Sequence, residues 1–238
     1  MPLVLTGPNA GEFLTQRSDA PDAARAVAQY RHHADSYDAS ARRTMRIRVR
    51  TIEKLVLRPG NRVLDVASGT GLSFPFLREA VGAQGEVVGI DISPEMMSLA
   101  RQRVTEAGWQ NITLLESSIE SADIPGPLDA VLLHFTHDVM RSPPALKRIF
   151  AAAGPNARIA IAGMKYVPWW MAPVNVIVRA KARPYMTTFE GLDTPWDLAL
   201  PYLSEFEWYP VLAGIGYIGW GRVHNAERAA FAPSNARR

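Results

Sequence analysis

A glycine-rich turn between an expected strand and an expected helix carries the strongest chemical signal in the sequence. Residues 63–71 read VLDVASGTG, so an acid, Asp65, precedes a turn with glycines at positions 69 and 71. Glycine lets a ligand approach the backbone closely, and the free N–H groups at the start of the next helix face that ligand. The turn therefore predicts a binding site for a small molecule.

The spacing of the glycines separates this turn from a dinucleotide-binding turn. In the G-x-G-x-x-G fingerprint a third glycine follows three positions after the second, and that position is Phe74 in this chain. A large side chain there argues against a tight turn around a pyrophosphate. The spacing disfavours an NAD-dependent reductase.

A second signal is the acid at the end of the next expected strand. Residues 86–91 read EVVGID, which places Asp91 about 20 residues beyond the glycine turn. A carboxylate at this place accepts hydrogen bonds from both ribose hydroxyls and repels a 2′-phosphate. A cofactor that contains a nucleoside fits both signals.

The elements that position these residues follow an alternating pattern. Short apolar strands are expected at 62–67, 86–91, 111–116, 128–135 and 157–163, and helices at 72–81, 94–108 and 143–154. This order predicts an α/β fold with right-handed crossovers and a mostly parallel sheet covered by helices on both faces. Two late runs, 207–213 and 217–223, predict a C-terminal antiparallel hairpin. The expected fold is a Rossmann-like, doubly wound sheet of about seven strands.

Composition excludes several classes of protein. The 238 residues include no Cys, which excludes disulfide scaffolds, thiolate metal sites and Cys nucleophiles, and no metal site is expected. A net charge of +3 is too small to indicate nucleic-acid binding. The start lacks a secretory pattern, so a cytoplasmic location is expected. The most apolar stretch, 166–178, is too short to span a bilayer.

Together, the glycine turn and Asp91 resemble those of the class I S-adenosylmethionine-dependent methyltransferases, in particular the branch similar to ubiquinone/menaquinone-biosynthesis methyltransferases. The resemblance covers residues 30–163. It implies S-adenosyl-L-methionine as cofactor and transfer of its methyl group to O, N or C of a small or lipid-like acceptor.

The resemblance also implies roles for individual residues. Asp65 would order the glycine loop and contact the methionine end of the cofactor, and Asp91 would hold the ribose. The loop would consist of Ala67, Ser68, Gly69 and Gly71. Ile92 and Met96 would flank the adenine ring. Ser118 stands where many relatives have an Asp that binds the adenine amino group, and Ile119 would supply a backbone N–H.

The same resemblance suggests the organisation of the chain. Residues 1–20 would form a flexible N-terminal arm. Residues 21–58 would form a helical lid of two helices joined near 38–40, with Tyr30 and Tyr37 over the cofactor; simple packing of these two tyrosines is the alternative. A methyltransferase core would follow at 59–225, with an acceptor-pocket insertion at about 164–205, and 226–238 would be a tail.

Two histidines after the fourth strand are the candidates for catalysis. The segment 134–138 reads HFTHD and should face the sulfonium and the acceptor. His134 and His137 are a candidate general base or acceptor-positioning pair, because imidazole titrates near neutral pH, and Asp138 would orient one of them. The alternative is that both are satisfied polar residues at a strand end.

An aromatic group and a basic group are open to two interpretations each. The aromatic segment could enclose an apolar ring, a lipid-like chain or a cationic nitrogen, or its side chains could pack in the core and lid. Its residues are Tyr166, Trp169, Trp170, Met171 and Tyr185, with Trp196 and Trp208. Prolines 168, 173 and 184 should break this segment into short pieces. The basic residues Arg42, Arg46 and Arg50 predict a solvated helix face; the alternative is attraction to an anionic acceptor, or to a phospholipid surface together with Trp169 and Trp170.

A second class of function stays open beside the enzyme. Ser118 and the unusual HFTHD segment are compatible with a non-catalytic relative that keeps the cofactor pocket and acts as a scaffold or regulatory subunit. Turnover of an acceptor separates the two hypotheses. The sequence does not indicate the oligomeric state.

Overall fold

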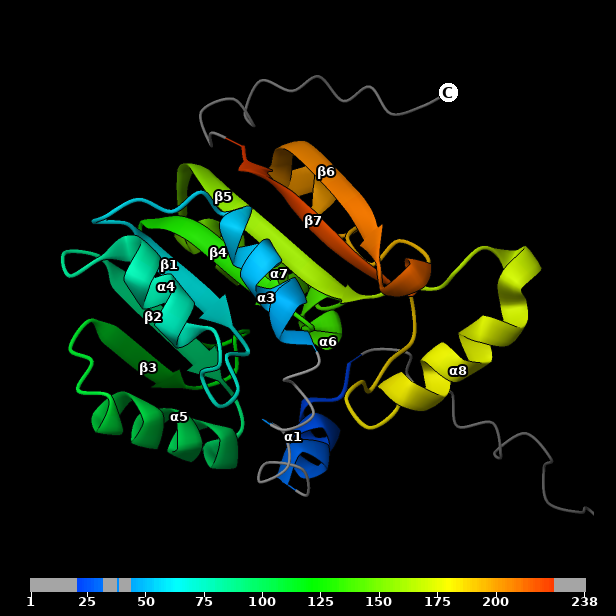
Figure 1. Cartoon of the computed structure of the whole chain (residues 1–238), viewed down its shortest axis with the longest axis horizontal. Coiled ribbons are helices and arrows are strands. Elements are labelled where there is room, and N and C mark those ends of the chain that lie inside the picture. The colour runs from blue at the N-terminus through cyan, green and yellow to red at the C-terminus, as the bar shows by residue number, and fades with distance from the viewer. Residues whose placement is uncertain (1–20, 32–37, 39–43, 225–238) are drawn as a thin grey trace, which may run out of the picture.

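The computed structural model describes residues 21–31, 38 and 44–224, and within them a seven-stranded mixed sheet of order β3-β2-β1-β4-β5-β7-β6 (Figure 1). The strands are β1 (Arg62–Val66), β2 (Glu86–Asp91), β3 (Ile112–Glu116), β4 (Leu128–His134), β5 (Ala153–Met164), β6 (Leu203–Val211) and β7 (Gly216–Val223). Strands β1 to β5 pair in parallel, and β7 pairs antiparallel with both β5 and β6. The expected fold class is confirmed.

Helices cover both faces of the sheet, as its apolar strands require. On one face lie α3 (Met45–Glu53), α4 (Phe74–Val81) and α5 (Pro94–Glu106), whose apolar side chains share a core with alternate residues of β1, β2 and β4. On the other face lie α6 (His137–Met140) and α7 (Pro143–Ala152), packed on the remaining strand residues. The two cores fix the carboxyl ends of the parallel strands at one edge.

One helix ends differently from the prediction. Glycines at 82, 108 and 154 all fall where helix ends are expected, and Gly82 and Gly108 do adopt left-handed backbone with φ of 66° each. Gly154 does not, because α7 passes through Ala153, at φ −70° and ψ 131°, directly into β5. A helix that continues into a strand needs no left-handed residue.

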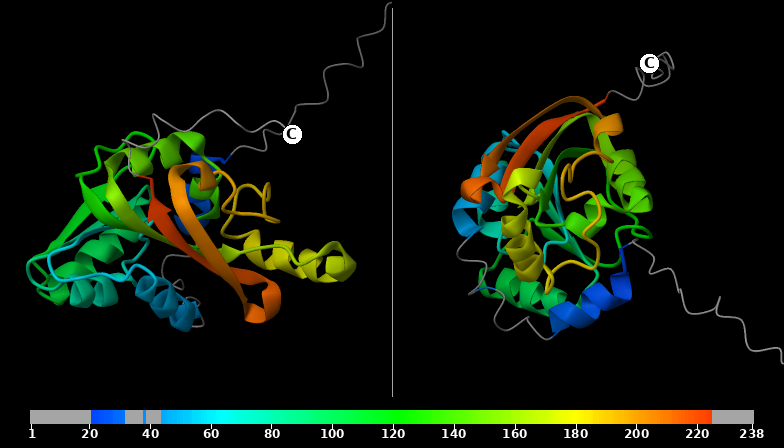
Figure 2. Two further views of the ribbon diagram at one scale, coloured as in Figure 1. Left: turned by 90° about the horizontal axis from the view of Figure 1, so that it is seen from above. Right: turned by 90° about the vertical axis from the view of Figure 1, so that its right-hand side faces the viewer.

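The segment between β5 and β6 contains one regular helix rather than fragments. A short 3₁₀ turn, η2 (Trp169–Met171), leads into α8 (Ala172–Ala182), and a second, η3 (Leu200–Tyr202), precedes β6; a third, η4 (Leu212–Gly214), lies between β6 and β7. Pro173 lies in the first turn of α8 and Pro184 follows its end, positions that a helix tolerates. These prolines therefore bound the helix. Helix α8 projects away from the sheet (Figure 2).

The N-terminal part contributes α1 (Ala23–Arg31), which packs near α5 at the carboxyl ends of the strands. The expected arm, the expected tail after 225 and most of the expected joint near 38–40 lie outside the described residues. Among the helices that the structure describes, none has the length and apolar character needed to cross a membrane.

Candidate active site

Two adjoining cavities lie at the carboxyl ends of β1, β2 and β4, where the strand order reverses direction. Their volumes are about 600 and 660 Å³. Both are lined by Ala26, Ala67, Asp91, Ile92, Asp138 and Val139. Crevices at such a switch point are the usual ligand sites of open α/β sheets.

The glycine turn has the strained, open backbone that its composition predicts. Ala67, Gly69 and Gly71 all have positive φ, at 48°, 57° and 78°. A Cβ on Gly71 would lie 2.4 Å from the ring of Phe74, which is fully buried. Phe74 therefore fills the space beneath the turn, and left-handed Ala67 marks a site where strain is kept for function.

Asp91 is fixed by the backbone on both sides of the cavity. Its Oδ2 accepts a hydrogen bond from the Gly69 N–H at 2.8 Å, and its Oδ1 accepts one from the Ser93 N–H at 2.9 Å. Burial raises the pKa of this carboxyl, and the two backbone hydrogen bonds oppose the rise. Each oxygen keeps a further lone pair for a ligand hydroxyl.

The cavity that contacts β3 holds the residues expected around an adenine ring. Ser118, Ile119 and Ile92 line it, while Met96 lines the second cavity beside His134. The Ser118 hydroxyl accepts the Glu120 N–H at 3.3 Å, so it serves the local turn. Of the two residues expected to flank the ring, Ile92 reaches both cavities and Met96 only the second.

Asp65 lies buried beneath the glycine turn with an oxygen, Oδ2, that has no hydrogen-bond partner. Burial raises its pKa from 3.8 to about 7, an effect that nearby Arg48 and a hydrogen bond with Ser73 oppose. Asp65 lines neither of the two cavities. A buried carboxyl oxygen without a partner is suited to a cationic or hydrogen-bond-donating group.

Arg48 of α3 is the functional candidate that sequence reasoning missed. Its side chain is 5% exposed, and its Nη1 donates to the Ser73 hydroxyl at 2.6 Å. Arg46 and Arg50, two members of the expected basic face, are exposed, and the third, Arg42, lies outside the described residues. Its burial could have been inferred from its position, because Ile52 and Leu55 follow it by four and seven residues and so lie on the same buried face of the helix.

The raised pKa of Asp65 predicts a pH dependence of stability. Between pH 4 and 7 the folded state holds a proton on Asp65 that the unfolded state releases, so rising pH lowers the free energy of unfolding. Asp65→Asn removes this loss. Chemical denaturation from pH 5 to 8 should show the variant gaining stability relative to the parent up to about pH 7 and levelling beyond. A difference constant across this range would contradict the pKa.

His134 ends β4 and is enclosed on all sides. Neither ring nitrogen has a partner among the described residues, and burial together with Arg48 lowers its pKa well below 6.5. The ring meets Phe135 edge-on at 4.8 Å, and Phe135 itself has a left-handed φ of 60°. A neutral imidazole beside a strained residue at a cavity wall indicates a functional position.

His137 has an orientation that suits a base. Its Nε2 lies 3.0 Å from the Glu190 carbonyl oxygen, and a carbonyl only accepts, so Nε2 carries the proton. Nδ1 is then an acceptor, and it has no partner. Burial lowers the pKa below 6.5, which keeps the ring neutral at pH 7.

Asp138 does not bind an imidazole as expected; it binds Thr187, in the segment after α8. Its carboxylate accepts from the Thr187 N–H and hydroxyl at 2.9 and 2.7 Å. The Thr187 hydroxyl oxygen also accepts the Asp22 N–H at 2.9 Å, at the entry to α1. Asp138 thus connects α6, the segment after α8 and the entry to the N-terminal helix around the cavity.

Arg141 holds the loop that orients His137. Its guanidinium binds Glu190 at 3.1 Å and also Asp197, and its side chain is 8% exposed. A Cβ on Gly191, with φ of 69°, would lie 2.6 Å from the guanidinium carbon. The glycine therefore lets the loop lie against Arg141 and place the Glu190 carbonyl.

The predicted aromatic group is divided by the fold. Tyr185 lines the second cavity, whereas Trp169 and Trp170 are 85% and 66% exposed. Trp196 is buried, with its ring centroid 4.6 Å from that of Trp208. Only the first of these places belongs to the candidate acceptor pocket.

Part of the expected lid is described. Ala26 of α1 lines both cavities, while Tyr37 and the side chain of Tyr30 lie outside the described residues. Asp38 accepts the Thr70 hydroxyl at 2.6 Å and pairs with Arg103. Sequence reasoning did not find this connection between the N-terminal segment and the glycine turn.

Comparisons with known proteins agree with this geometry. Residues 63–156 match the family model described as a methyltransferase domain. The demethylmenaquinone methyltransferase of Anoxybacillus flavithermus is 31% identical over 53% of this chain and 56% of its own. The ubiquinone/menaquinone biosynthesis C-methyltransferase of Ectopseudomonas mendocina is 33% identical over 47% of this chain and 44% of its own. The chain thus spans about half the length of these relatives.

A solved structure shows the same fold. The N-methyltransferase NodS of Bradyrhizobium japonicum, in complex with S-adenosylhomocysteine, aligns with a TM-score of 0.54 and 14% identity over 75% of this chain and 86% of its own. Residues 63–156 are therefore similar to methyltransferase domains, and the described part of the chain has the fold of a solved methyltransferase that binds S-adenosylhomocysteine. The curated relatives to which it is similar include methyltransferases of ubiquinone and menaquinone biosynthesis.

Proposed function

We propose that the whole chain is a methyltransferase that acts on a hydroxyl-bearing aromatic acceptor of the phenol or hydroquinone type, at O or ring C. The observation that carries this proposal is the neutral, oriented imidazole of His137 in the cavity next to Asp91. Phe135 and Tyr185 add aromatic wall to the same cavity. The named substrates of the relatives are of the quinone class and support it.

The described residues fit the cofactor. We propose that Asp91 binds the ribose, that Ser118 and Ile119 lie beside the adenine, and that Asp65 and Ser68 face the methionine end. Asp65 Oδ2 and Ser68 Oγ are buried without partners, which a bound amino-acid group would supply. S-adenosylmethionine, when bound, supplies an electrophilic methyl group on sulfur.

In this proposal the chain orients the acceptor, excludes water from the reacting atoms and supplies a proton acceptor. His137 Nδ1 takes the proton of the acceptor hydroxyl, and the resulting phenolate oxygen, or its ring carbon, forms the bond to the methyl carbon as the carbon–sulfur bond breaks. When the bond forms at ring carbon, the proton of that carbon is then released to solvent, and His137 returns its proton to the phenolate oxygen. His134 is a neutral wall residue that positions the acceptor.

His137→Gln should lower kcat about a hundredfold or more and leave the dissociation constant for S-adenosylhomocysteine within about twofold, because it removes only the proton acceptor. The assay measures transfer of labelled methyl from S-adenosylmethionine to a panel of phenols and hydroquinones. His224→Gln is the matched control, since His224 lies at the end of β7 and lines neither cavity.

Equal rates for His137→Gln and the parent from pH 6 to 9 would show that the acceptor needs no base. S-adenosylhomocysteine binding without turnover of any acceptor would favour the non-catalytic scaffold instead. A cytoplasmic location and the absence of nucleic acid among the partners stay predictions of the proposal, for cell fractionation and binding assays to test.

A further inference from the structure

Helix α8 and the turn before it present an apolar surface to solvent, here called the outer face. Trp169 and Trp170 are 85% and 66% exposed, and Val176 and Ile177 are 68% and 54% exposed. With exposed Pro173 they fall at spacings of three and four residues, which aligns them on one side of the helix. Large apolar side chains gathered in this way mark an interaction surface.

The outer face is not the side by which α8 is attached. Val178 and Ala182 are buried, Ala182 in a cluster with Met186 and Leu192, and Asn175 fixes the start of the helix through two hydrogen bonds with Val167. The inner side of α8 therefore packs against the rest of the protein. A helix that is apolar on both sides would normally be buried on both, so the outer face lacks its partner within the described residues.

The charged residues in the segment that contains α8 have a single sign. Residues 139–189 include no Asp or Glu, whereas four basic residues flank or belong to α8: Lys165, Arg179, Lys181 and Arg183. Arg179 is exposed, with its guanidinium carbon 5.1 Å above the Phe189 ring. Exposed tryptophans with flanking cations are the composition of helices that lie in the headgroup region of anionic bilayers.

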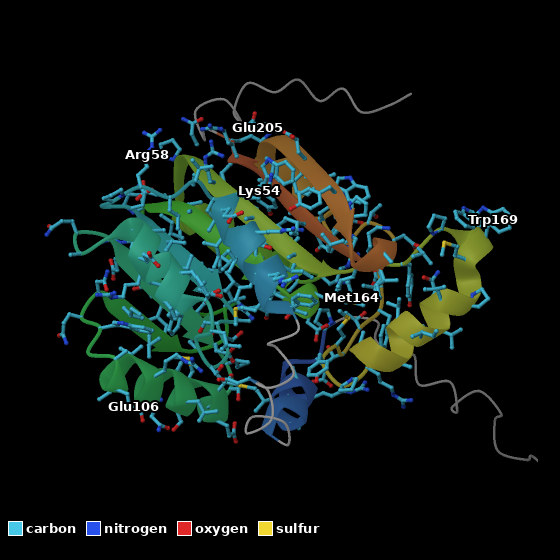
Figure 3. All side chains as sticks on the ribbon, viewed as in Figure 1. Lys54, Arg58, Glu106, Met164, Trp169 and Glu205 are labelled. Atoms are coloured by element: carbon cyan, nitrogen blue, oxygen red, sulfur yellow. The ribbon has the colours of Figure 1, made fainter. Side chains whose placement is uncertain are left out.

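The placement of α8 suits contact with an extended surface. The helix projects from the body of the molecule, with Trp169 at its far end and Met164, at the end of β5, near the body (Figure 3). At the opposite end of α8 the chain reaches Tyr185, which lines the second cavity. A bilayer against the outer face would therefore lie close to the mouth of the candidate acceptor pocket.

We propose that the outer face of α8 docks this protein on an anionic phospholipid surface. A two-fold dimer through the same face would set the same cations against each other, which disfavours a second copy as the occupant. The inference concerns binding to lipid alone and stands independently of the methyl-transfer proposal.

Co-sedimentation of the full chain with vesicles tests the proposal. Binding should be about tenfold or more stronger to phosphatidylcholine vesicles that contain phosphatidylglycerol than to phosphatidylcholine alone, and salt should weaken it. Trp169→Ser with Trp170→Ser should reduce binding to the anionic vesicles about tenfold or more. Val56→Ser is the matched control, because Val56 follows α3, is 53% exposed and lines neither of the two cavities of the candidate active site.

The thermal midpoint and the S-adenosylhomocysteine affinity of the double variant should equal those of the parent, which separates loss of docking from loss of fold. No binding of the parent to anionic vesicles, or equal binding by the double variant, would overturn the proposal. A parent that sediments as a dimer, a double variant that sediments as a monomer, and no vesicle binding by either would assign the face to a second copy instead.

Discussion

Asp91→Ala should lower the affinity for S-adenosylhomocysteine about a hundredfold or more. The carboxylate is held by the Gly69 and Ser93 N–H groups at 2.8 and 2.9 Å, so it is already aimed when the ligand arrives. In the proposed binding mode, the substitution removes two charge-assisted hydrogen bonds to the ribose, each worth about 1.5 to 3 kcal/mol, and leaves the Gly69 N–H without its acceptor.

Calorimetric titration of parent and variant measures this loss directly. Asp123→Ala is the matched control, because Asp123 is exposed and lines neither cavity. Asp91→Asn should give an intermediate loss, since the amide still accepts one hydrogen bond but carries no charge. An unchanged dissociation constant for Asp91→Ala would remove Asp91 from the cofactor site.

Arg48→Met should lower the free energy of unfolding by about 3 to 5 kcal/mol, because it removes a buried positive charge that faces a buried carboxyl. The guanidinium is buried and donates to Ser73 at 2.6 Å, and its charge opposes the rise in the pKa of Asp65. Methionine keeps most of the volume but leaves the Asp65 and Ser73 groups without their cation.

Urea denaturation at pH 8, where Asp65 is ionised in the parent, shows the effect most clearly. Arg46→Met and Arg50→Met are matched controls on the same helix, and both should stay within about 0.5 kcal/mol of the parent because these side chains are exposed. If all three substitutions cost the same, Arg48 has no special role in the site.

Short sequence patterns were enough to predict the fold and to select the residues that we propose to bind the cofactor. The alternating apolar runs set the strands, and the turn at 63–71 with Asp91 depends on residues whose positions follow from two adjacent parallel strands. Because the carboxyl ends of such strands meet at one edge, two short motifs suffice to place a cavity between them.

The acceptor half depends on contacts between residues far apart in sequence. The Glu190 carbonyl fixes the tautomer of His137, and Asp138 binds Thr187, about fifty positions away in each case. Backbone carbonyls carry no sequence signal, so the role of Glu190 could not be predicted. Arg48 differs, because its spacing to Ile52 and Leu55 was a sequence signal for burial, but its hydrogen bond with Ser73 became visible only once α3 was seen to pack on the sheet.

Proline marks another limit of local pattern. Pro173 and Pro184 predict an interrupted segment when counted as breakers, yet their positions at the first turn and just beyond the end bound a continuous α8. A proline that bounds a helix and a proline that interrupts one look the same in the sequence. Only the position of the proline relative to the helix ends distinguishes them.

The central claim is that the two cavities hold S-adenosylmethionine, and titration of the purified chain with S-adenosylhomocysteine, with NADH as the matched ligand, tests it most directly. The geometry of Asp91, Asp65 and the glycine turn predicts micromolar binding of S-adenosylhomocysteine and no measurable binding of NADH, for which Phe74 occupies the place of the third glycine. Absence of S-adenosylhomocysteine binding, or tighter binding of NADH, would contradict the account.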